Sequence, residues 1–178
     1  PIHSSAASDV YKRQTYATYY KLMQELVDAG KTTGPNQSES MAHYTKMNLQ
    51  RMTRLDKKAV VRPDLIEAFR GWPGEYIWLV ITEAWCGDAA QIIPIFSAIV
   101  GQLPNAEMSL VLRDELPDLM DQFLTNGSRA IPKLIILEKE SLEVVETWGA
   151  RPAPAQAMVD EYKANPNRPP YACLLYTS

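Results

Sequence analysis

The first part of the chain carries the hydrophobic spacing of helices. Tyrosine, methionine and leucine side chains recur at helical intervals through residues 16–27, and Gly30 follows as a stop signal. A second stretch with this spacing covers residues 41–55, after a polar segment that we interpret as a loop. Pro63 lies near the first turn of a short third helix, residues 64–69. The pattern predicts an N-terminal helical region.

Farther along the chain, short continuous apolar runs replace the helical spacing. Residues 76–82 are apolar and rich in β-branched side chains, which is typical of a strand buried on both faces. We predict strands at residues 76–82, 108–112, 134–137 and 143–148, and helices at residues 88–103, 117–123 and 153–162. Strands joined through helices are expected to pair in parallel, and the last two strands are expected to form a hairpin. The order β-α-β-α-β-β-α predicts an α/β fold.

Composition and charge narrow the classes of function. The 178 residues carry a net charge of −3 and lack the clustered Lys and Arg of a nucleic-acid-binding surface. No apolar run approaches the roughly 20 residues that a membrane-spanning helix needs. We therefore expect neither a nucleic-acid partner nor a membrane partner.

The two ends of the chain are related at the level of DNA. One DNA string can encode residues 9–14, and its reverse complement can encode residues 173–178. We interpret both ends as translated sequencing-library adapter, with residues 4–8 as its upstream part, and exclude them from the fold. The natural gene is then expected to extend further at both ends.

Cys86 is the residue with the most informative chemistry. It is the one cysteine outside the adapter-like ends, because Cys173 belongs to the second of them, so no internal disulfide is expected and a reducing, cytoplasmic location is favoured. Cys86 follows a predicted strand and begins a predicted helix, where unpaired amides and the helix dipole favour a thiolate. We therefore expect a pKa for Cys86 below that of free cysteine. The alternative is a small buried apolar residue.

The neighbours of Cys86 affect the access of a partner to this thiol and the stability of its thiolate. Gly87 would let the backbone of a partner approach closely, whereas the carboxylate of Asp88 would oppose a thiolate. Arg113 and Arg129 would offset Asp88 if the fold brings either one near. Trp85 either shields the thiol and contacts partners or simply packs in the core.

The segment around Cys86 resembles the active site of thioredoxins. Residues 83–94 read Glu-Ala-Trp-Cys-Gly-Asp-Ala-Ala-Gln-Ile-Ile-Pro, where that family has Trp-Cys-Gly-Pro-Cys followed by a helix proline. Residues 128–135 resemble the second signature of the family, and residues 148–150 resemble the turn before its last helix. The likeness covers about residues 76–164 and is greatest to uncharacterised bacterial thioredoxin-family proteins with such a helical region.

The resemblance implies a thioredoxin-like fold, with a central four-stranded mixed sheet and an N-terminal helical extension. The expected domain boundaries are an adapter-derived segment at residues 1–14, the helical extension at residues 15–72, the thioredoxin-like domain at residues 73–172 and a second adapter-derived segment at residues 173–178. The resemblance also implies that Ile131–Pro132 is a cis peptide bond beside Cys86, with a backbone that pairs with an incoming peptide.

Three departures from the family pattern determine the expected chemistry. Ala89 replaces the second, resolving cysteine, Asp88 replaces the proline of the motif, and Val80 replaces the buried acid of the preceding strand. A mixed disulfide on Cys86 would then have to be resolved by an external thiol. We expect a monothiol thiol–disulfide oxidoreductase whose partners are a client protein or a low-molecular-weight thiol or disulfide, without a cofactor.

Other functions are weighed against this expectation. The first alternative is a non-catalytic binding module that holds a partner across Trp85 and Ile131–Pro132. A cysteine peroxidase is disfavoured, because no Thr-x-x-Cys arrangement surrounds Cys86. His43 is the one histidine outside the adapter-like ends, so no zinc site is expected. A catalytic pair of Cys86 and His43 is conceivable, but we expect His43 to be an ordinary helix residue.

Overall fold

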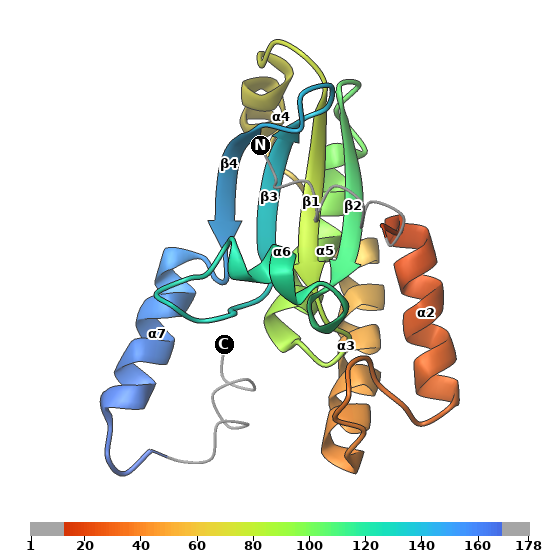
Figure 1. Ribbon diagram of the computed structural model, residues 1–178, viewed down its shortest axis with the longest axis vertical. Coiled ribbons are helices and arrows are strands. Elements are labelled where there is room, and N and C mark those ends of the chain that lie inside the picture. Colours follow the sequence, from red (N-terminus) through yellow and green to blue (C-terminus); the bar gives the residue numbers. More distant parts are fainter. Residues whose placement is uncertain (1–12, 169–178) are drawn as a thin grey trace.

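The computed structural model describes residues 13–168 and places the N-terminal helices beside a four-stranded sheet (Figure 1). Most of the two adapter-like ends therefore lies outside the described residues. The helices are α2 (Tyr16–Asp28), α3 (Glu39–Lys58), α4 (Pro63–Arg70), α5 (Gly87–Val100), α6 (Pro117–Asp121) and α7 (Ala153–Ala164), with a 3₁₀ helix η2 (Arg113–Glu115). The strands are β1 (Tyr76–Thr82), β2 (Ala106–Leu112), β3 (Lys133–Glu138) and β4 (Val144–Gly149). This order confirms the predicted β-α-β-α-β-β-α succession.

The sheet has the strand order β2-β1-β3-β4 and is mixed. β1 pairs in parallel with β2 and antiparallel with β3, so Val80 lies opposite Leu110 on one side and Leu134 on the other. β3 and β4 pair antiparallel, which confirms the predicted hairpin. All seven residues of β1 are buried, as the continuous apolar run predicted.

The predicted parallel direction of β3 is wrong. The chain from β2 to β3 stays at the end of the sheet where β1 and β2 finish, and Figure 1 shows α6 at this end. Helix α6 has 5 residues and rises about 8 Å, whereas β2 has 7 residues and spans about 23 Å. Because α6 is too short to carry the chain back along the sheet, β3 begins beside the end of β1 and runs the opposite way.

The N-terminal helices pack onto the sheet and its central helix. α5 packs against β1 and β2, α3 packs against α5, and α2 packs against α3 and β2. Before α2 begins, the backbone of Gln14 exchanges two hydrogen bonds with Leu110 at the outer edge of β2, with N–O distances of 3.0 and 2.8 Å. The predicted division between an extension and a domain at residue 72 stays a prediction, but the two parts share one core.

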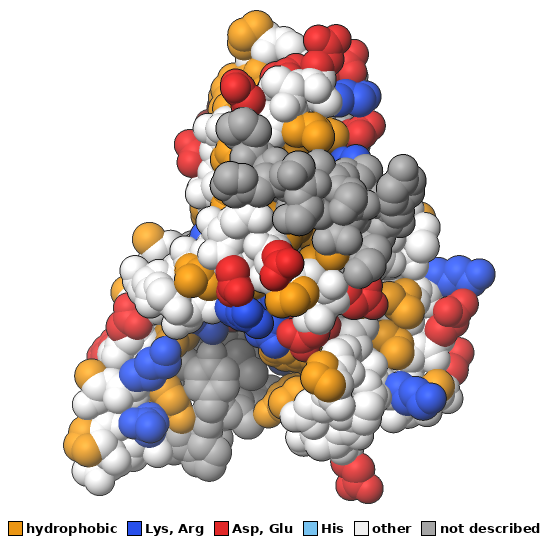
Figure 2. Space-filling view, in the orientation of Figure 1, with side chains coloured by type: hydrophobic (Ala, Val, Ile, Leu, Met, Phe, Trp, Pro, Cys, Tyr) orange, Lys and Arg blue, Asp and Glu red, His pale blue; other side chains and the backbone are white. Residues whose placement is uncertain are grey.

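The described surface is mixed in character. On the face shown in Figure 2, the hydrophobic side chains lie scattered among charged ones. Exposed large hydrophobic residues include Val60, Leu124 and Val145, which belong to different parts of the fold. Among the described helices, none combines the length and the apolar character that crossing a membrane requires.

Gly149 at the end of β4 provides a test of the packing beside Pro132. Its φ is +143°, and a Cβ there would overlap the carbonyl oxygen of Pro132 and lie 3.1 Å from the Cα of Lys133. Gly149→Ala is expected to lower the free energy of unfolding by about 2 kcal/mol or more, measured by urea denaturation.

Gly30→Ala is the matched control for this substitution. Gly30 also has a positive φ, +64°, but a Cβ there would meet no atom within 4 Å. Its cost is expected to be about 1 kcal/mol. An equal loss of stability in the two variants would contradict the close approach of Gly149 to Pro132.

Candidate functional site

Cys86 lies at the junction between β1 and α5. It is the residue that caps the N-terminus of α5, and its amide donates a hydrogen bond to the carbonyl of Glu83 with an N–O distance of 3.1 Å. Its thiol is 3.5 Å from the carbonyl oxygen of Ile131 and donates to it. The bond Ile131–Pro132 is cis, so the predicted cis bond beside Cys86 is confirmed.

The predicted lowering of the Cys86 pKa is wrong. Cys86 is only 7% exposed, and this burial raises the pKa of its thiol to about 11. The amides of Ala89 and Asp88 lower the pKa, as expected at a helix N-terminus, and the carboxylate of Asp88 raises it. Burial therefore outweighs the helix N-terminus at this cysteine.

The arginine that balances Asp88 is Arg151. The side chains form an ion pair with an N–O distance of 2.6 Å, and Arg151 lowers the pKa of Cys86. Arg113 and Arg129, which were expected to offset Asp88 if the fold brought either one near, line the same pocket but pair with other carboxylates. Arg113 pairs with its neighbour Asp114 at 2.8 Å, and Arg129 forms a bidentate pair with the carboxylate of another residue, Asp121.

Trp85 lies half-buried at the rim of the site. The guanidinium carbon of Arg113 is 4.9 Å from the centroid of the Trp85 ring, which is the geometry of a cation–π contact. The Trp85 side chain thus packs against the core and also borders the space around Cys86, and its contact with a partner stays a prediction.

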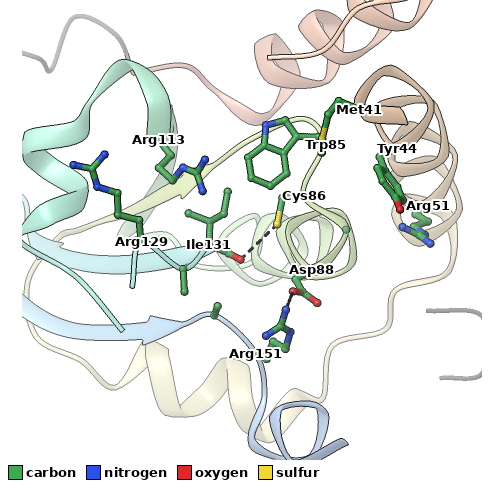
Figure 3. A pocket seen from close by; sticks show the side chains of 13 residues that line it. Met41, Tyr44, Arg51, Trp85, Cys86, Asp88, Arg113, Arg129, Ile131 and Arg151 are labelled. Carbon is green, nitrogen blue, oxygen red and sulfur yellow. Dashed lines mark hydrogen bonds and ion pairs between the residues drawn. The ribbon is translucent and has the colours of Figure 1, made fainter. Parts of the chain in front are cut away.

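The side chains around Cys86 enclose a pocket of about 350 Å³ (Figure 3). Four of the lining side chains are arginines, whereas one is a carboxylate. The lining residues are Met41, Tyr44, Arg51, Trp85, Cys86, Gly87, Asp88, Arg113, Arg129, Ala130, Ile131, Ala150 and Arg151. Most of the predicted site residues are therefore brought together here. Ala89 and Pro132 are buried beneath this surface.

Helix α3 supplies one wall of the pocket. Asn48 is 1% exposed and donates a hydrogen bond from Nδ2 to the carbonyl of Ala84, 2.9 Å away, in the turn before Cys86. Its Oδ1 accepts a hydrogen bond from Nη1 of Arg51 at 2.9 Å. His43 of the same helix is exposed and does not line the pocket, so the conceivable pair with Cys86 is not formed.

A comparison with protein families connects this geometry to known proteins. The family model described as thioredoxin matches residues 34–163. The chain belongs to the thioredoxin family. The match includes α3 and α4 as well as all four strands, so the wall of the pocket formed by α3 lies within the matched part.

Two solved structures share the thioredoxin fold of this chain. A protein of unknown function from Pseudomonas aeruginosa is 21% identical with a TM-score of 0.52, over 92% of this chain and 87% of that one. An HIV epitope-scaffold is 22% identical with a TM-score of 0.50, over 83% of this chain and 82% of that one. A comparison with curated proteins finds no match. At these identities the likeness concerns the fold.

A buried acid lies just before Cys86, at Glu83 rather than at Val80. Val80 is fully buried in the sheet, while Glu83, just after β1, is 1% exposed. The Glu83 carboxylate accepts hydrogen bonds from the hydroxyl of Thr33 and from the amide of Asp114, the latter at 2.8 Å. Burial raises the pKa of Glu83, and these two donors partly oppose that change. Glu83 thereby joins three segments: the loop after α2, the end of β1 and the turn η2.

Asn48, Arg51 and Arg151 are among the residues of this site that sequence reasoning missed. Asn48 lies four residues from both Tyr44 and Met52, so it occupies the apolar face of a predicted helix. A polar side chain on such a face signals a buried hydrogen bond, and this signal was available. Arg151 had no comparable local signal. The described residues contain no group of three or more His, Cys, Asp or Glu side chains placed to hold a metal ion.

The charges beside Cys86 lead to a prediction about its reactivity. Asp88→Asn removes the carboxylate that raises the pKa of Cys86 and leaves Arg151 in place. We expect the pKa of Cys86 to fall and its alkylation by iodoacetamide at neutral pH to become about fivefold faster, measured by intact-protein mass spectrometry. Arg151→Gln is expected to slow the reaction. Asp118→Asn, in the first turn of α6 and outside the pocket, is the control and should leave the rate unchanged.

Glu83 leads to a prediction about stability. Because its pKa is raised from 4.5 in the folded state, this group stabilises the fold most below about pH 4.5, and that contribution is lost as the pH rises through the folded pKa. Glu83→Gln removes this loss. Relative to the unmodified protein, the variant should therefore gain free energy of unfolding as the pH rises from acidic to neutral, measured by urea denaturation. Glu143→Gln, on an exposed loop, is the control, and identical pH profiles for both variants would refute the assignment.

Proposed function

We propose that this thioredoxin-family protein is a monothiol thiol–disulfide oxidoreductase that uses Cys86 together with an external resolving thiol. The observation that carries the proposal is the position of the Cys86 sulfur. It lies at the start of α5, 3.5 Å from the carbonyl oxygen of Ile131, and borders an open pocket. A substrate sulfur that enters this pocket can reach the Cys86 sulfur without passing through the core.

The proposed reaction is a pair of exchanges at sulfur. Deprotonated Cys86 attacks one sulfur of a client mixed disulfide, a new bond forms to Cys86, and the cysteine of the client leaves as a thiolate. Ala89 cannot attack the new disulfide. An external thiolate therefore attacks the sulfur that is not Cys86, releases Cys86 as a thiolate and forms a small disulfide. The client is reduced, and the external thiol is oxidised.

The raised pKa of Cys86 sets the pH dependence of this reaction. With a pKa of about 11, the resting thiol is largely protonated at neutral pH. The rate of the first exchange is expected to increase with pH up to about 11, because the thiolate is the attacking form. A redox role therefore requires either slow turnover or a bound partner that stabilises the thiolate.

The burial of Cys86 also favours a second candidate, a binding module without redox turnover. In that case a partner would bind across Trp85 and Ile131–Pro132, and the protonated thiol would remain bonded to the carbonyl of Ile131. The two candidates differ in whether Cys86 forms a mixed disulfide and is later released from it as a thiol.

A substitution in α5 distinguishes the candidates. Ala89→Cys supplies a second thiol one turn after Cys86, at the position of the missing resolving cysteine. In an oxidoreductase, this variant should release a mixed-disulfide adduct from Cys86 without an external thiol, whereas the unmodified protein should retain the adduct. Intact-protein mass spectrometry after treatment with a disulfide-linked peptide measures both species.

Cys86→Ser completes the experiment. It should form no adduct, and Ala89→Ser should behave as the unmodified protein does. If the unmodified protein forms no adduct at any pH up to 11, and Cys86→Ser keeps a binding partner that the unmodified protein captures, the binding module replaces the oxidoreductase.

A further inference from the structure

The pocket beside Cys86 has an excess of positive charge that its own carboxylates do not balance. Three of its arginines pair with carboxylates: Arg113 with Asp114, Arg129 with Asp121 and Arg151 with Asp88. Within the described part of the chain, the fourth arginine, Arg51, forms no ion pair, and its guanidinium donates to the neutral amide oxygen of Asn48. The charge that Arg51 brings to the pocket is therefore available to a ligand.

Arg51 is held in a defined position over the start of α5. Its Nη1 would lie 3.2 Å from a Cβ built on Gly87, so the guanidinium approaches the backbone next to Cys86. Asn48 fixes this position, because its Oδ1 holds Nη1 while its Nδ2 is bonded to Ala84 in the turn before Cys86. Figure 3 shows Arg51 on the wall formed by α3, across the pocket from Arg113 and Arg129.

The guanidinium retains donors for an anionic group. A guanidinium carries five N–H donors and binds carboxylates in a bidentate manner. One nitrogen of Arg51 is engaged by Asn48, and Arg51 lines the pocket. The pocket of about 350 Å³ is near the lower limit for sites that bind small molecules, which favours a low-molecular-weight ligand over an extended peptide.

We propose that Arg51 is the anion-binding residue of this pocket and that the small thiol which resolves Cys86 carries a carboxylate. This inference rests on the proposed monothiol function and names the chemical class of its external thiol. The carboxylate pairs with the guanidinium of Arg51 while the sulfur of the same molecule is bonded to Cys86. Arg51 is a binding residue in this proposal.

The reaction that the inference describes is balanced. The Cys86 thiolate attacks one sulfur of a carboxylate-bearing disulfide, a Cys86–sulfur bond forms, and the other half leaves as a thiolate. A second molecule of the small thiol, as its thiolate, then attacks the bound half. Cys86 is released as a thiolate and the symmetric disulfide of the small thiol forms. Where the first disulfide joined a client cysteine to the small thiol, the client cysteine is the half that leaves, so the client is reduced and the incoming small thiol is oxidised.

Two disulfides with the same carbon skeleton test the role of charge. Dithiodipropionate carries two carboxylates, whereas its diamide is neutral. Intact-protein mass spectrometry measures the rate at which each forms an adduct on Cys86 at alkaline pH and low salt, and an unstructured cysteine peptide provides the intrinsic ratio of the two rates. For the unmodified protein, the ratio of the anionic to the neutral rate is expected to exceed that of the peptide by about fivefold.

Variants of α3 assign this preference to Arg51. Arg51→Gln should lower the ratio about fivefold, and Arg51→Lys should keep part of it, because the charge remains but the bidentate geometry of the guanidinium is lost. Arg54→Gln removes the same charge from an exposed position of α3 outside the pocket and should leave the ratio unchanged. High salt should reduce the preference of the unmodified protein.

The outcomes separate this inference from the proposed function. If adducts form and Arg51→Gln leaves the ratio unchanged, or slows both probes equally, the anion-binding role is refuted and the monothiol function stands. If neither probe ever reacts with Cys86, the monothiol function itself fails. If Arg51→Gln alters the reaction with an acidic disulfide-linked peptide but not with the small probes, a client protein replaces the small thiol.

Discussion

The site depends on the hydrogen bonding of one buried turn. Between the end of β1 and the start of α5, Glu83 and Ala84 are about 1% exposed, so their polar groups must find partners within the protein. The N-terminal helical region supplies them. Thr33 accepts the amide hydrogen bond of Ala84 and donates to the Glu83 carboxylate, and Asn48 donates to the Ala84 carbonyl. The helical region is therefore part of the site, since without it this turn would keep unsatisfied polar groups.

A competition between burial and backbone dipoles explains the state of Cys86. The amides at the start of α5 favour a thiolate, and such an effect is visible from the sequence alone. Burial opposes this effect, because removing the sulfur from water disfavours the thiolate. The extent of burial depends on how closely Ile131 and the surrounding elements cover the sulfur. A pattern of residues shows where a helix begins but not how deep its first residue lies. The direction of the pKa change was for that reason beyond what sequence reasoning could settle.

Features set by local sequence patterns could be predicted, whereas features set by tertiary packing could not. β1 was predicted at the residues where it occurs, because a continuous apolar run has few alternatives, and the contact between Cys86 and Ile131–Pro132 followed from two motifs. The direction of β3 was missed because it depends on the path of a long connection with a short helix. Arg151 and Arg51 were missed because tertiary packing brings them to Cys86 from distant segments.

Because Ala89 occupies the position of a resolving cysteine, the second step of the proposed reaction depends on access through the pocket. In a dithiol enzyme, the second sulfur lies within the same helix, and no molecule needs to enter for the second step. Here Ala89 occupies that position and is 1% exposed, so any resolving sulfur must approach through the pocket that Cys86 borders. In the proposed monothiol reaction, the client and the external thiol would use the same opening in turn. If Arg51 binds a carboxylate as proposed, its position on the wall of α3, away from Trp85 and Ile131, gives the small thiol a contact that the client does not need to occupy.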